Sequence, residues 1–78
     1  MENTYVSILY KNKRINILKF LSESNTTFQK RLSFIKKLEK YNIHIDEIEN
    51  LSIIWYYIKY KNCKYDNYTM NKIAIYDK

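Results

Sequence analysis

The chain has 78 residues, a formal net charge of +6, 46% hydrophobic residues, and neither glycine nor proline. This length allows one small domain over residues 1–78, and the apolar content argues against disorder. Without glycine, the chain cannot contain a P-loop, a dinucleotide-binding fingerprint or a nucleophile elbow.

The positive charge is a weak indication of a polyanionic partner, because the composition follows codon bias. Lys, Ile, Asn and Tyr make up more than half of the chain, and these residues use A/T-rich codons. Arginine, whose planar fork matches phosphates and bases, occurs only at Arg14 and Arg31. A phage, a mobile element or a parasite with an A/T-rich genome would produce this lysine excess without selection for nucleic-acid binding.

Two apolar runs near the N-terminus predict a β-hairpin. Residues 4–10 and 15–21 are rich in aliphatic and aromatic side chains, and the polar residues 11–14 separate them. Asn12 is the residue expected at positive φ, because asparagine tolerates that conformation better than most residues with a side chain. The second arm has a helical alternative, since its apolar residues also fit a helical stripe: Ile17, Leu18 and Leu21.

An amphipathic helix is predicted next. Residues 26–29 have the pattern of a capping box formed by Thr26 and Gln29, and Asn42 suits the C-terminal stop. The apolar residues recur at helical spacing, with two more beside them: Phe28, Leu32, Ile35, Leu38, Phe34 and Tyr41. The lysines fall on the opposite side: Lys30, Lys36, Lys37 and Lys40. We therefore expect the apolar stripe to be buried and these lysines to face solvent.

The second half of the chain predicts two more strands. The acidic cluster at residues 44–50 is expected to form a short helical turn. Residues 53–58 are β-branched and aromatic on both faces, as in a central strand, and residues 68–76 partly alternate. Asn62 or Asn67 would supply a positive φ in the turn between them. The alternative for the first segment is a helix over residues 46–61 with an apolar stripe: Ile48, Leu51, Trp55 and Ile58.

The expected fold is α+β, with one amphipathic helix packed on a mostly antiparallel four-stranded sheet in the order β-β-α-(short α)-β-β. Because one helix covers only one face of a small sheet, one aromatic row of the second hairpin would stay exposed. Alternation assigns Trp55 and Tyr57 to one row and Tyr56 and Tyr60 to the other.

No motif indicates catalysis, a cofactor or a metal. His44 and Cys63 are each the sole residue of their type, which excludes a Cys/His zinc site. The acidic residues after His44 fit a solvated helix start better than an acid/base pair. A lone cysteine is typical of a reducing, intracellular setting, here the host cytoplasm, and residues 1–4 lack the pattern of a signal peptide. The longest nearly apolar run, residues 51–58, is too short to span a membrane.

The main functional hypothesis is a small, non-enzymatic protein-binding effector or accessory subunit, such as an inhibitor or antidefence factor. In size, A/T bias and lack of motifs the chain is similar in type to small phage-encoded inhibitors, anti-CRISPR proteins among them, although no residue motif carries this similarity. Tyrosine and tryptophan commonly anchor interfaces, and lysines would form a basic rim. The expected interface residues are Trp55, Tyr56, Tyr57, Tyr60, Tyr65 and Tyr68, with Lys59, Lys61 and Lys64. The partner would be a host complex or a second copy of the chain.

The alternative hypothesis is a small basic protein that binds RNA or DNA. Lysines of the helix and turn would contact phosphates while tyrosines stack on bases. The candidate phosphate contacts are Lys11, Lys13, Arg14, Lys30, Lys36, Lys37 and Lys40. With so few arginines, we expect any such binding to be weak and non-specific.

Overall fold

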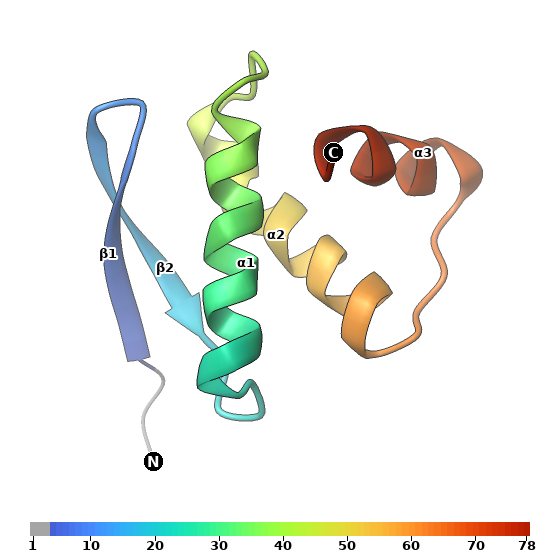
Figure 1. Cartoon of the computed structure of the whole chain (residues 1–78), viewed down its shortest axis with the longest axis horizontal. Coiled ribbons are helices and arrows are strands. Elements are labelled where there is room, and N and C mark those ends of the chain that lie inside the picture. Colours follow the sequence, from blue (N-terminus) through green and yellow to red (C-terminus); the bar gives the residue numbers. More distant parts are fainter. Residues whose placement is uncertain (1–3) are drawn as a thin grey trace.

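Two antiparallel strands followed by three helices make up the computed structural model, which describes residues 4–78 (Figure 1). The elements are β1 (Thr4–Tyr10), β2 (Lys13–Lys19), α1 (Asn25–Leu38), α2 (Ile45–Tyr60) and α3 (Asn67–Tyr76). The predicted α+β class is retained, but the predicted four-stranded sheet is wrong, because the sheet has two strands. Residues 1–3, which belong to the segment considered for a signal peptide, lie outside the described residues.

The predicted N-terminal hairpin is present, with a shorter turn. Lys11 and Asn12 have φ values of 49° and 65°, and Tyr10 pairs with Lys13. Positive φ at both central residues is the requirement of a type I′ turn, whose twist matches that of the paired strands. The prediction for Asn12 is confirmed, whereas β2 begins two residues earlier than predicted because Lys13 already belongs to the strand.

Helix α1 begins and ends earlier than predicted. The Ser24 side chain accepts a hydrogen bond from the Thr27 backbone N–H at 3.1 Å, so Ser24 is the N-cap and the capping box assigned to residues 26–29 is wrong. The helix ends at Leu38 because the backbone tightens there: the Glu39 N–H bonds to the Lys36 carbonyl at 3.2 Å. Asn42 does not adopt a positive φ and is not the stop.

The two predicted C-terminal strands are both helices. Residues 53–58 belong to α2, as the helical alternative had it, because Ile48, Leu51 and Trp55 meet the core at helical spacing. Their β-branched and aromatic side chains favour a strand only as a statistical tendency, which packing overrides. Residues 68–76 belong to α3, whose N-terminus is capped by Asp66: its carboxylate accepts from the Thr69 N–H at 2.8 Å. Asn62 has a positive φ of 55°, as predicted, but it follows a helix instead of joining two strands.

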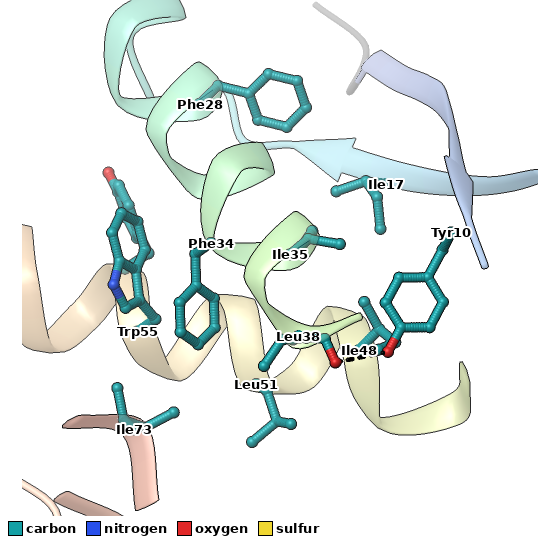
Figure 2. Packing of buried hydrophobic residues seen from close by; sticks show 11 residues of the cluster. Tyr10, Ile17, Phe28, Phe34, Ile35, Leu38, Ile48, Leu51, Trp55 and Ile73 are labelled. Carbon is teal, nitrogen blue, oxygen red and sulfur yellow. Dashed lines mark hydrogen bonds between the residues drawn. The ribbon is translucent and has the colours of Figure 1, made fainter. Parts of the chain in front are cut away.

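The core lies between α1, the inner face of the hairpin and α2 (Figure 2). Phe34 of α1 stacks on Trp55 of α2, with ring centroids 5.3 Å apart and an interplanar angle of 14°. The Tyr10 hydroxyl donates to the Leu38 carbonyl at 3.2 Å, which joins the hairpin to the end of α1. Of the predicted stripe, Leu32 is only half-buried, whereas the other three residues are buried: Phe28, Ile35 and Leu38.

Arg31 occupies the interior, a position that no sequence pattern indicated. Its guanidinium donates to the Glu23 carboxylate at 2.8 and 3.0 Å, to the Ser52 hydroxyl at 3.0 Å, and to the Leu18 carbonyl. It also lies over the Phe20 ring, 4.7 Å from the centroid. Arg31 therefore connects β2, the loop before α1, and α2.

Candidate protein-binding surface

Helix α3 is joined to α2 by residues 61–66, here called the connecting segment, and packs on the body of the molecule through one side. Figure 1 shows the connecting segment as an extended stretch and α3 beside α1, on the side opposite the hairpin. Ile73 is the buried residue of α3, and Met70 is half-buried. A crevice remains between α2 and α3, lined by Ile58, Lys59, Met70, Ile73, Ala74 and Asp77. The apolar packing of α3 is therefore incomplete.

Asp77, directly after α3, ties this helix to α1 and α2. Its carboxylate lies 3.2 Å from the Lys37 ammonium and 3.3 Å from the Lys59 ammonium. Lys37 also donates to the Asp77 backbone carbonyl at 2.8 Å. We call these contacts the Asp77 clasp. Lys37, which the sequence placed in solvent, is thus partly buried.

The Asp77 carboxyl is ionised at neutral pH. Partial burial acts to raise its pKa, as expected when a charge leaves water. The ammonium groups of Lys37 and Lys59 outweigh burial and hold this pKa below its ordinary value. The clasp therefore pairs two positive charges with one negative charge.

The opposite side of α3 presents apolar side chains to solvent, and at its C-terminal end the half-buried Tyr76 ring packs on Tyr41. Tyr68 is 74% exposed and Ile75 is 50% exposed. Lys72 lies between them in sequence, with its ammonium 5.7 Å from the centroid of the Tyr68 ring. A shallow hollow on this side is lined by Tyr68, Asn71, Lys72, Ile75 and Tyr76. We call these five residues the α3 outer face.

Lysines of α3 and of the connecting segment lack carboxylate partners. After Glu49 the only acidic side chains are Asp66 and Asp77. Asp66 caps α3, and its pKa is lowered by the side-chain and backbone hydrogen bonds of Thr69, whereas Asp77 is held in the clasp. Within residues 4–78, three lysines of this region form no ion pair: Lys61, Lys64 and Lys72. Lys72 therefore combines with the exposed apolar groups of the α3 outer face as a positive charge that no carboxylate of the described chain neutralises.

The predicted interface residues divide between the core and this surface. Trp55 and Tyr56 are buried. The prediction of two alternating aromatic rows is therefore wrong, because residues 53–60 are helical and their side chains do not alternate between two faces. Tyr60 lies at the edge of the aromatic cluster, 5.8 Å from Trp55 and 5.7 Å from Tyr56 between ring centroids. Over a third of the surface of Tyr57, Tyr60 and Tyr65 is exposed. Lys59 belongs to the clasp, whereas Lys61 and Lys64 lie on the exposed connecting segment.

Four residues of the α3 outer face were not predicted: Asn71, Lys72, Ile75 and Tyr76. Their spacing from Tyr68, at three, four, seven and eight residues, is that of one helix face and would have identified them if residues 68–76 had been interpreted as a helix.

Most of the predicted phosphate-binding residues are engaged elsewhere. Lys36 donates to the Leu9 carbonyl at 2.7 Å and to the Glu39 carboxylate at 2.8 Å. Three further side chains bond within the fold: Lys11 to the Tyr41 carbonyl, Arg14 to the Ser7 hydroxyl, and Lys40 to the Lys78 carbonyl. Lys37 is in the clasp, and Lys13 and Lys30 are exposed on different elements, β2 and α1. Five of the seven candidate side chains therefore already bond within the fold, and their contact with phosphate stays a prediction.

A second set of exposed apolar residues lies at the other end of the molecule. Tyr5 on β1 is 65% exposed, and Leu21 after β2 is 57% exposed. Tyr5 and Leu21 are comparable to Tyr68 and Ile75 in exposed fraction and in side-chain chemistry. They therefore provide control positions for the α3 outer face.

His44 and Cys63, the two residue types considered for metal binding or catalysis, lie apart at an N-cap and on the connecting segment. The His44 side chain accepts from the Asp46 backbone N–H at 3.3 Å and caps α2, and the Cys63 thiol is exposed. Among residues 4–78, no three His, Cys, Asp or Glu side chains gather as metal ligands would. No helix in the same range is long and apolar enough to cross a membrane.

Comparison of the chain with protein-family models, with curated proteins and with solved structures finds no match.

Proposed function

We propose that this protein is a non-enzymatic effector that acts by binding another protein through the α3 outer face. The observation that carries this proposal is the arrangement of α3: one side is docked on the body of the molecule, while the other presents Tyr68 and Ile75 to solvent. A tyrosine and an aliphatic residue on a docked helix resemble the anchors of protein interfaces.

The charge on α3 and on the connecting segment indicates the kind of partner. Lys61, Lys64 and Lys72 lack carboxylate partners within residues 4–78. A partner surface with exposed Asp and Glu would complement them, which favours fast and selective encounter more than it increases affinity. We therefore propose an acidic protein surface as the partner.

Binding to RNA or DNA is the less supported function. Arg31 is buried, so Arg14, which is exposed and donates one hydrogen bond to Ser7, is the one arginine of the described chain placed for bidentate contact with phosphate or guanine. Ile75 also gives the α3 outer face an aliphatic part, which suits a protein side chain better than a stacked base.

The wider role remains part of the same proposal. A small chain of A/T-biased composition that lacks catalytic motifs fits an inhibitor, an antidefence factor or an accessory subunit. An intracellular site, the host cytoplasm, agrees with the single exposed thiol of Cys63.

Comparative capture from cells of the source organism tests the proposal. The wild-type protein, Y68A/I75A and the control Y5A/L21A are each used as bait after nuclease treatment, and the captured proteins are quantified by mass spectrometry. We expect one protein to be retained by wild type and by Y5A/L21A, lost with Y68A/I75A, and then to bind directly when purified. Equal capture by Y68A/I75A, or loss of the captured protein on nuclease treatment, would contradict it.

A further inference from the structure

We infer that the α3 outer face binds an acidic amphipathic helix of the partner. This inference rests on the proposed function and specifies the structure and the charge pattern of the bound segment.

The shape of the α3 outer face favours a helix as the bound segment of the partner. Tyr68, Lys72 and Ile75 follow each other at spacings of four and three residues along one side of α3. From Tyr68 to Tyr76 the stripe extends about 12 Å, or roughly two helical turns. Helices commonly pack by placing side-chain ridges into such grooves, and the hollow beside Asn71 provides one.

The backbone of α3 excludes an extended partner paired as a β-strand. Its N–H and C=O groups are bonded within the helix, so they cannot form a ladder with another chain. The free edges of the hairpin are also restricted, since Lys36 occupies the Leu9 carbonyl and Arg31 the Leu18 carbonyl. Binding at the α3 outer face must therefore depend on side chains.

Lys72 determines the charge of the partner helix. It lies in the middle of the apolar stripe, and its ammonium is over the Tyr68 ring. A purely apolar helix placed on Tyr68 and Ile75 would remove this ammonium from water without a partner, which is unfavourable. A carboxylate one turn from the apolar anchors of the partner would satisfy it.

The same residue excludes a symmetric pairing of two α3 helices. A second copy would bring its own Lys72 to the interface, and its neighbouring lysines would add like charge. The α3 outer face therefore fits a different, acidic protein better than a second copy of this chain.

Selection from two displayed peptide libraries tests this inference. One library presents stable amphipathic helices with randomised outer positions, and the other presents randomised disulfide-closed loops. Both are selected on the wild-type protein and depleted on Y68A/I75A, with Y5A/L21A as the matched control. We expect binders from the helical library, each with an Asp or Glu between two apolar positions.

A charge exchange then tests the role of Lys72. We expect K72E to weaken these helices roughly tenfold or more, and a Glu→Lys change in the helix to restore binding to K72E. The control K30E alters an exposed lysine on α1 and should leave binding unchanged. Binders that lack carboxylates, or that show no restoration, would overturn the inference.

The remaining outcomes separate this inference from the proposed function. If binders sensitive to Y68A/I75A come only from the loop library, the helical partner is wrong while protein binding at this surface stands. If neither library yields such binders, both are contradicted. If a single-stranded dT oligonucleotide binds at physiological salt and Y68A/I75A abolishes its binding, the surface binds nucleic acid and both are again contradicted.

Discussion

Arg31 and Glu23 form a two-pronged ion pair in the interior of the protein, with N···O distances of 2.8 and 3.0 Å and both side chains at 0% exposure. The pair is completed by the Phe20 backbone N–H, which donates to the same carboxylate at 3.1 Å. Because the ion pair connects the hairpin to α1 and α2, its disruption should affect the whole fold.

We expect Arg31→Ala to destabilise the protein by about 3–5 kcal/mol, because Glu23 would be left buried without its counter-charge. Replacing both partners, as in E23L/R31M, should recover much of this loss, since neither buried charge remains. Urea unfolding measures both effects. Stability of Arg31→Ala equal to wild type would show that the pair is dispensable.

The α1 stripe gives a graded prediction. Ile35 is fully buried, whereas Leu32 is half-buried, so Ile35→Ala should cost about 2–5 kcal/mol and Leu32→Ala clearly less. Thermal and urea unfolding of the two variants would check the order. A larger loss of stability for Leu32→Ala than for Ile35→Ala would contradict the orientation of α1 toward the core.

The hairpin turn should respond to the φ value of Asn12. Asn12→Gly should be neutral or mildly stabilising, because glycine adopts a φ of 65° without strain. Asn12→Val should lose about 1–2 kcal/mol, since a β-branched residue is disfavoured there. Lys13→Val, in the adjoining strand, serves as the control and should be nearly neutral. Equal stability of both valine variants would refute the turn geometry.

The Asp77 clasp predicts a weaker attachment of α3 in acid. The folded-state pKa of Asp77 is lowered, so its contribution to stability is complete above the ordinary carboxyl pKa and is lost as pH falls through the lowered value. The free energy of unfolding should therefore decrease below about pH 4. Asp66, whose pKa is also lowered, should add to the same decrease.

Fluorescence of Trp55, the single tryptophan, can follow this acid transition. Asp77→Asn should lower stability at neutral pH and flatten the acid dependence, while Asp66→Asn should remove only the part due to the cap. An acid profile of Asp77→Asn identical to that of wild type would show that the clasp does not hold α3.

Local signals predicted the first half of the fold and not the second. The hairpin and α1 follow from short-range patterns, namely two apolar runs around Asn12 and an apolar stripe from Phe28 to Leu38. The segment at residues 53–58 carries residue types that favour strands, and only its contacts with α1 decide for a helix. The Arg31–Glu23 pair joins positions eight residues apart, and because Glu23 lies in the loop before α1, the helical period of α1 does not relate them.

The sequence predicted which types of residue form the candidate surface but not where in the fold that surface lies. Tyr65, Tyr68, Lys61 and Lys64 are exposed as expected, yet two of the predicted interface aromatics, Trp55 and Tyr56, form part of the core. Which tyrosines remain exposed depends on the packing of α2 and α3, which residue types alone do not determine. Asp66 and Thr69 resemble an N-cap pair and were the local signal available for α3.

Backbone amide shifts of the ¹⁵N-labelled protein, recorded with and without the captured partner, test the central claim most directly. If the α3 outer face is the binding surface, the largest changes will fall on residues 64–76, and residues 4–19 of the hairpin will be unaffected. Y5A/L21A will give the same changes as wild type, and Y68A/I75A will keep the fold and give none. Changes concentrated on the hairpin, or undiminished in Y68A/I75A, would contradict the claim.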